Sequence, residues 1–311
     1  MSRKPGQSPL WVHINQTQIT KETTMDLTNF KSSGVNFKIA LWDPQVNGVR
    51  YLKALIYNLC ASLSSDNWSR LRQIRNREVG NPVAVKYNGE IVCMDYLQAV
   101  FEMEFMANNI NLGGLSILEI GAGYGRTCHT IVSNHDVIAY YIIDLENSLD
   151  MAKRYLSVVL DKEQFAKIHY VTVDDVDKLA GATRFDLCIN IDSFAEMNVD
   201  TVKYYLALVD AQCHYFYVKN PVGKYLDKSL DDHSQGNEIV ALALSTGVLR
   251  DIIDIHDSQV VEAQVQKFIS AYQPGEKWKC IANDWAIPWS YYWQALYQKR
   301  DIEVENVDAI K

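Results

Sequence analysis

From residue 113 to residue 218 the chain alternates short apolar runs with segments whose apolar positions recur every three or four residues. The second kind of spacing predicts helices, for example over 147–159, which Asn147 or Ser148 would cap. Strands that alternate with helices predict a mostly parallel sheet covered on both faces, because parallel neighbours need crossover connections. The predicted strands are 116–120, 137–143, 169–173, 185–191 and 215–218.

The segments on either side of this region lack the regular alternation of strands and helices. Helical patterns cover 47–63 and 67–77, and Tyr87-Asn88-Gly89 between two short apolar runs predicts a β-hairpin, because Asn-Gly accepts positive φ. Asp95 is predicted to cap the helix that follows. After residue 220 come a polar loop, two helical segments and a closing hairpin that includes 291–297.

Composition narrows the class of protein. Hydrophobic residues make up 48% of the 311 residues and charged residues 22%, as in ordinary globular proteins. The longest apolar run, 137–143, is far shorter than the ~20 residues of a membrane span. A net charge of −8 argues against nucleic-acid binding. The six cysteines form no C-x-x-C pair and no signal-peptide pattern follows the basic start, so we expect a cytoplasmic protein.

The strongest chemical signal is a glycine-rich turn. Gly121, Gly123 and Gly125 directly follow the apolar strand 116–120 and precede a helical segment. Glycines at this position permit a tight turn and let a ligand approach the backbone. Asp144 ends the next predicted strand, 23 residues after Gly121, where an acid binds the ribose of a nucleoside cofactor. The combination predicts a nucleoside site.

The glycine spacing and a nearby acid distinguish between cofactors. Dinucleotide sites favour G-x-G-x-x-G, whereas this turn is G-x-G-x-G with Glu119 two residues before its first glycine. A carboxylate there repels a pyrophosphate but attracts a cation, such as the sulfonium and ammonium of S-adenosylmethionine. The segment Leu-Glu-Ile-Gly-Ala-Gly-Tyr-Gly resembles motif I of the class I S-adenosylmethionine-dependent methyltransferases.

That resemblance implies a Rossmann-like fold, with a mostly parallel seven-stranded sheet, an antiparallel last strand and an N-terminal helical extension. It also implies that Gly121 and Gly123 line the methionine portion, Asp144 holds the ribose, and Asp174 or Asp175 contacts the adenine. The full set of cofactor-binding residues that we predict is Glu119, Gly121, Ala122, Gly123, Asp144, Leu145, Asp174 and Asn190.

A narrower resemblance covers roughly residues 80–298. Gly80-Asn81-Pro82 with the hairpin, Gly-Tyr-Gly-Arg, Ile-Ile-Asp-Leu and Asn-Ile-Asp-Ser-Phe-Ala-Glu-Met are similar to a family of sugar O-methyltransferases. This similarity implies O-methylation of a small polar acceptor, a sugar or a sugar conjugate. It implies three regions: 1–112 as a cover for the acceptor side, 113–300 as the methyltransferase domain and 301–311 as a tail.

The base that accepts the hydroxyl proton is left open among three residues. Asp192 and Glu196 lie four apart, on one face if 193–198 is helical, and His233 lies in the loop after the fifth strand. Asp231 and Asp232 are a weaker alternative as Mg²⁺ ligands, and no metal residue is assigned. The tryptophans and tyrosines of 278–293 suit the core of the closing hairpin or a contact in a homo-oligomer.

Three other functions compete with sugar methylation. They are methylation of another small molecule or of a protein, a nicotinamide-dependent oxidoreductase, and a methyltransferase-like domain that binds without reacting. The glycine spacing and Glu119 disfavour the oxidoreductase.

Overall fold

The structure is a computed structural model that describes residues 8–17, 20, 43–179, 183–231 and 235–300. These residues form two compact units. The first combines the described residues up to Ser62 with Val83–Val92, and the second combines Leu63–Pro82 with the chain from Cys93 onward. The division therefore does not coincide with the predicted boundary after residue 112, because 63–82 and 93–112 belong with the sheet. The predicted tail, 301–311, lies outside the described residues.

The first unit contains two helices and a hairpin. Its helices are α1 (Pro9–Thr17) and α2 (Pro44–Ser62), and its strands are β1 (Ala84–Tyr87) and β2 (Glu90–Cys93), which continues to the unit boundary. Asn88 and Gly89 have φ values of 49° and 88°, so the predicted Asn-Gly hairpin is confirmed. Tyr57 of α2 packs edge-on against Tyr87 of β1, with 5.0 Å between ring centroids.

The second unit is built on a seven-stranded sheet with the order β5-β4-β3-β6-β7-β9-β8. The first five strands are parallel, whereas β9 runs antiparallel to both β7 and β8. This arrangement confirms the predicted mostly parallel sheet with an antiparallel last strand. The strands are β3 (Ser116–Ile120), β4 (Ala139–Asp144), β5 (Ile168–Thr172), β6 (Phe185–Ile191), β7 (Cys213–Pro221), β8 (Trp278–Trp285) and β9 (Tyr292–Lys299).

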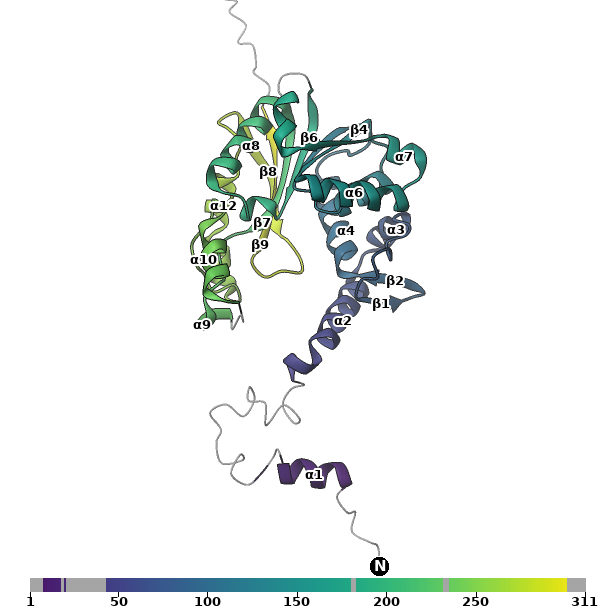
Figure 1. Ribbon diagram of the computed structural model, residues 1–311, viewed down its shortest axis with the longest axis vertical. Helices are drawn as coiled ribbons and strands as arrows, with labels where there is room; N and C mark the ends of the chain where they lie inside the picture. Colours follow the sequence, from purple (N-terminus) through teal and green to yellow (C-terminus); the bar gives the residue numbers. More distant parts are fainter. Residues whose placement is uncertain (1–7, 18–19, 21–42, 180–182, 232–234, 301–311) are drawn as a thin grey trace, which may run out of the picture. The chain divides into compact units, whose positions relative to one another are not determined.

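Two hydrophobic cores lie on the two faces of this sheet, because successive side chains of a strand point to opposite faces. Ile117 packs with α4 (Met94–Ala107), α5 (Arg126–Asn134) and α6 (Glu146–Val159). Leu118 packs in the other core, which contains α8 (Val199–Gln212), α11 (Ser258–Ala263) and α12 (Val265–Ala271). Figure 1 shows α8 and α12 on one side of the sheet and α4 and α6 on the other. The remaining helices of this unit are α3 (Ser65–Gln73), α7 (Lys162–Ala166), η3 (Val173–Lys178), η4 (Ser193–Ala195), α9 (Lys228–Asp231) and α10 (Asn237–Ser245).

The strand order places a crevice beside β3. Its neighbours, β4 and β6, lie on opposite sides, so the connections that leave their carboxyl ends diverge. In open sheets of this kind ligands bind at such a switch point. The glycine-rich turn and residues 190–196 both lie there.

Two predicted helix caps are wrong. α4 begins at Met94, directly after β2, and Asp95 in its first turn accepts a hydrogen bond from the Tyr124 hydroxyl instead of capping (3.1 Å). α6 begins at Glu146 with Leu145 at its N-cap, before the predicted caps Asn147 and Ser148. In the part of the chain that the structure describes, none of the helices has the length and apolar character needed to cross a bilayer.

Candidate functional site

The three glycines of the turn all have left-handed φ values, but each is required for a different reason. A Cβ on Gly121 would lie 2.1 Å from Ser193 Oγ, and a Cβ on Gly125 would lie 2.8 Å from a methyl group of Leu156. A Cβ on Gly123 would meet nothing within 4 Å. The chain's own packing therefore demands glycine at 121 and 125, whereas Gly123 leaves its backbone open to a ligand.

Asp144 connects the end of β4 to this turn. One carboxylate oxygen accepts a hydrogen bond from the Gly123 amide (2.8 Å), and the other accepts one from the Leu145 amide (2.7 Å). Each carboxylate oxygen can accept a further bond, so the side chain retains acceptor capacity. Asp144 and the glycine turn, which we predict to form one nucleoside site, are thus in direct contact, and the contact of Asp144 with a ribose stays a prediction.

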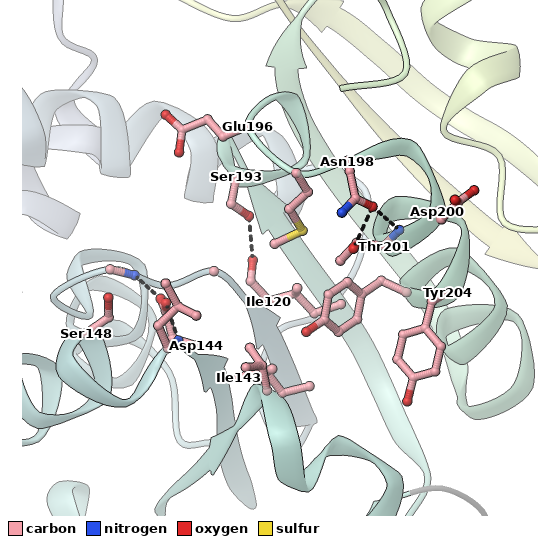
Figure 2. Close-up of a pocket in the computed structure, with 16 residues that line it drawn as sticks. Ile120, Ile143, Asp144, Ser148, Ser193, Glu196, Asn198, Asp200, Thr201 and Tyr204 are labelled. Carbon is pink, nitrogen blue, oxygen red and sulfur yellow. Dashed lines mark hydrogen bonds between the residues drawn. The ribbon is translucent and has the colours of Figure 1, made fainter. Parts of the chain in front are cut away.

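A cavity of about 930 Å³, here called cavity A, opens beside Gly123 and Asp144. Figure 2 shows Asp144 and Tyr204 on opposite sides of Ile120 and Ile143 in this cavity. Leu145, another residue that we predict to bind the cofactor, also lines it. The sequence analysis missed Val173, Ser193, Tyr204 and Tyr205, which line it too.

Asp174 does not line cavity A. It is exposed in the first turn of η3, and the preceding residue, Val173, faces the cavity instead. Asp175 pairs with Lys178 at 2.7 Å. Contact of Asp174 with the adenine stays a prediction. In the structure, the residue of this segment that could contact a ligand in cavity A is the apolar Val173.

A smaller polar cavity of about 280 Å³, here called cavity B, shares Gly121 and Gly123 with cavity A. Its lining includes two predicted cofactor residues, Glu119 and Ala122. Side chains of both charges line it: the carboxylates of Asp95, Glu119 and Asp192, and the cations of Arg126 and Lys219.

Glu119 is only 2% exposed and accepts a hydrogen bond from the Tyr140 hydroxyl (2.8 Å). Burial raises its pKa to about 7, against the lowering effect of hydrogen bonds from Tyr140 and Thr127. This carboxyl therefore changes charge close to neutral pH, and a cation in cavity B would favour its ionised form.

A buried ionic cluster forms the base of cavity B. Glu102 of α4 accepts two hydrogen bonds from Arg126 (3.1 and 2.8 Å) and one from Lys219 (2.7 Å). Burial would raise the Glu102 pKa, but the two cations lower it, so the carboxylate is charged. Glu102 thus holds both cations, Arg126 and Lys219, at the wall of cavity B.

Asn190, also predicted to bind the cofactor, makes hydrogen bonds within the protein. It is fully buried at the end of β6, where its amide donates to Ile120 O (3.0 Å) and to Ser193 Oγ (2.7 Å). Its own oxygen accepts from Asn220 (2.9 Å). Asn190 lines neither cavity A nor cavity B, and its bond to Ser193 holds that residue over Gly121, so its role in binding the cofactor stays a prediction.

Asp192 and Glu196 meet at a third cavity of about 440 Å³, here called cavity C. The condition for a shared helix face, a helical segment over 193–198, is not met, because the 3₁₀ turn covers only Ser193–Ala195. Asp192 adopts φ 69° and accepts a hydrogen bond from the Tyr292 hydroxyl (2.6 Å). Asp192 also lines cavity B and Glu196 also lines cavity A, so both carboxylates stand where the cavities adjoin.

Electrostatics distinguish Glu196 further. Burial is the main cause that raises the pKa of Glu196. The negative charge of Asp192 raises this pKa further, whereas the positive charge of Lys224 lowers it. The third candidate base, His233, lies outside the described residues, as does Asp232. Within the described ranges, no group of three or more His, Cys, Asp or Glu side chains is placed to hold a metal ion.

Comparisons with known proteins were made against families, curated sequences and solved structures. No family model and no curated protein matches the chain. Among solved structures, the chain is similar to magnesium protoporphyrin IX methyltransferase of Synechocystis PCC 6803 with bound SAH (14% identity, 76% of this chain and 95% of that one, TM-score 0.42). It is also similar to the glycopeptide N-methyltransferase MtfA complexed with S-adenosylmethionine (14%, 65% and 94%, TM-score 0.43). A third similarity is to the methyltransferase domain of bacterial CtHen1 (13%, 65% and 96%, TM-score 0.43).

These similarities are weak, and the chain's own strand order decides the fold class: five parallel strands on either side of a switch point, followed by an antiparallel hairpin in which β9 lies inside β8. The chain has the Rossmann-like fold that the sequence predicts. In this fold, cavities A and B lie at the carboxyl ends of β3, β4 and β6, as ligand sites do at a switch point.

Proposed function

We propose that the protein is an S-adenosylmethionine-dependent methyltransferase. The observation that carries the proposal is the position of Asp144, which is bonded to the open Gly123 backbone at the edge of the 930 Å³ cavity. Asp144 has free acceptor capacity for ribose hydroxyls, and Ile143, Val173 and Tyr204 offer apolar surface to a base. A nucleoside therefore fits cavity A.

The charges of cavity B fit the other end of the cofactor. An amino-acid head group carries one ammonium and one carboxylate, and cavity B presents Glu119 and Asp192 to the first, and Arg126 and Lys219 to the second. Gly121 and Gly123, which line both cavities, would lie beside the linking atoms. The donor set thus fits S-adenosylmethionine better than a dinucleotide, because a pyrophosphate has no cationic group to meet the carboxylates of Glu119 and Asp192.

We further propose that the methyl group goes to a hydroxyl of a small polar acceptor, a sugar or a sugar conjugate, in cavity C. The acceptor identity rests on the resemblance in residues 80–298, and its placement rests on the 440 Å³ cavity that Asp192 and Glu196 both line. A hydroxyl between these carboxylates would be oriented by hydrogen bonds and could lose its proton to one of them.

When bound, S-adenosylmethionine would supply a methyl group on a sulfonium sulfur, and that sulfur would keep the electron pair of the C–S bond when the acceptor oxygen takes the methyl group. Glu196 would take the hydroxyl proton, and because burial and the charge of Asp192 raise its pKa, it is a better proton acceptor than an ordinary glutamate. Tyr292 donates to Asp192 and so holds the second carboxylate in place.

Calorimetry separates the competing functions. We expect S-adenosylmethionine to bind and NAD not to bind; binding of NAD alone would contradict the proposal. Incubation of the protein with methyl-labelled cofactor and a panel of sugars, other small molecules and proteins should then label a sugar. A labelled protein or non-sugar product would support methyl transfer to a different acceptor. Cofactor binding without transfer to any acceptor would indicate a binding domain.

A further inference from the structure

Helix α10 presents an apolar surface that the protein does not bury. Six of its nine residues, 239–244, are apolar, yet none is buried. Ile239 is 56% exposed and Leu242 is 60% exposed. Apolar side chains stabilise a structure when they are removed from water. The apolar side chains of α10 stay partly in water and therefore contribute little to the stability of this chain.

The exposed stripe forms one wall of cavity C. Ile239, Leu242 and Ala243, spaced i, i+3, i+4, all line it, and Leu226 extends the apolar part. Asp192 and Glu196 line the same cavity. Cavity C therefore has both an apolar part on α10 and a carboxylate part on the segment that also borders cavities A and B.

The cationic group at cavity C is already engaged. Lys224 is 7% exposed, and its Nζ donates to Ala195 O (2.9 Å) and to Thr246 Oγ1 (3.3 Å). These bonds tie the carboxylate-bearing segment to the end of α10. Lys224 thus helps to keep the apolar wall and the carboxylates at a fixed separation.

We propose that the acceptor is an amphipathic alcohol: a hydroxyl-bearing glycosyl group joined to an aliphatic or aromatic group that packs on Ile239 and Leu242. This inference rests on the proposed function and specifies its substrate class. A bare sugar would place hydroxyls against apolar side chains that cannot bond them, at a cost in free energy. A volume of 440 Å³ fits a small molecule and is within the range of small-ligand sites, about 300–1,000 Å³.

The test compares acceptors that share one sugar and differ in the apolar group. We expect n-hexyl β-D-glucoside, kept below its micellar concentration, to bind the protein saturated with S-adenosylhomocysteine at least about tenfold more tightly than methyl β-D-glucoside. Leu242→Gln should remove most of this difference. Val158→Gln is the matched control, because Val158 is also helical, 62% exposed and outside cavity C.

The readouts separate this inference from the proposed function. If the wild-type protein fails to bind S-adenosylmethionine in calorimetry, the proposed function fails. If it binds the cofactor but hexyl and methyl glucosides bind equally or not at all, the acceptor class is wrong. An advantage for the hexyl compound that Leu242→Gln leaves unchanged also overturns it. So does a concentration-dependent dimer that Leu242→Gln dissociates, because a second copy would then cover α10.

Discussion

Ser193 lies so close to Gly121 that a methyl group on Gly121 would meet its hydroxyl at 2.1 Å and its Cβ at 2.4 Å. Ser193 in turn donates to Ile120 O (3.2 Å) and accepts from Asn190 (2.7 Å). The glycine turn and the segment after β6 are therefore one packed unit. A change at Gly121 must displace the loop that carries Asp192 and Glu196.

Gly121→Ala should destabilise the protein by about 2–4 kcal/mol, from overpacking against Ser193 together with left-handed strain. Gly123→Ala should cost only about 1 kcal/mol, because it adds strain without a clash. Chemical denaturation measures both. In the double variant with Ser193→Gly, much of the loss at Gly121 should be recovered; strictly additive losses would argue against the contact.

Asp144→Asn should weaken S-adenosylmethionine binding about tenfold or more, because hydrogen bonds to a charged group contribute ~1.5–3 kcal/mol. The asparagine oxygen can still accept from the Gly123 amide, so the turn should keep its shape. Calorimetry gives the affinity and thermal unfolding checks the fold. An unchanged affinity in a folded variant would remove Asp144 from the cofactor site.

Glu196→Gln should greatly lower kcat once an acceptor is known. The wild-type pH–rate profile should show an acidic limb above the ordinary glutamate pKa of 4.5, because burial and Asp192 raise the pKa of Glu196. The rate should fall when the pH drops below the raised pKa of Glu196, because the base is then protonated. The limb should be missing from the residual activity of the variant; a limb that persists there would assign the base to Asp192 or His233.

Glu119 should make stability depend on pH. The pKa of Glu119 is about 7 in the folded protein and 4.5 ordinarily, so the fold favours the protonated carboxyl. The resulting contribution to the free energy of unfolding is complete below pH 4.5 and is lost as the pH rises through 7. Relative to Glu119→Gln, the wild-type protein should lose on the order of 3 kcal/mol between pH 4.5 and 8. Urea unfolding at several pH values measures this. Glu146→Gln, at an exposed position, is the control and should track the wild type.

Glu102→Gln should destabilise the protein by about 3–5 kcal/mol, because it leaves Arg126 and Lys219 buried without their carboxylate. The control is Glu104→Gln on the same helix. Glu104 is 32% exposed and 3.7 Å from Arg70, and such pairs contribute about 1 kcal/mol or less. Similar losses in both variants would show that the buried cluster is not special.

The sequence analysis succeeded where local pattern decides structure. Asn88-Gly89 predicted its hairpin because the two residues accept positive φ, and the alternation of strands and helices predicted the parallel sheet. It failed at helix starts: neither Asp95 nor Asn147 caps a helix, since the preceding strand or turn leads directly into the first turn. Caps depend on how the chain enters a helix, which neighbouring residues do not reveal.

The site was predicted in part. The pairing of Asp144 with the glycine turn follows from spacing along a strand–turn–helix unit, and the structure shows it as a hydrogen bond. Tyr204 and Val173 carried no signal, because a tyrosine or valine facing a cavity has the same local pattern as one packed in a core. For Asn190, a position near the end of β6 suggests a ligand contact, whereas the bonds that the structure shows go to Ile120 O, Ser193 and Asn220.

By itself, the sequence determined the alternation of strands and helices, the glycine turn and the acid that meets it, because each depends on residues close together in the chain. Tertiary structure alone decided that Gly121 packs against Ser193 and that Glu102 lies between two cations. It also brought Asp192 and Glu196 to the apolar wall of α10. These relationships join residues 24 to 117 positions apart, where strand order and packing, not local propensity, set the distance.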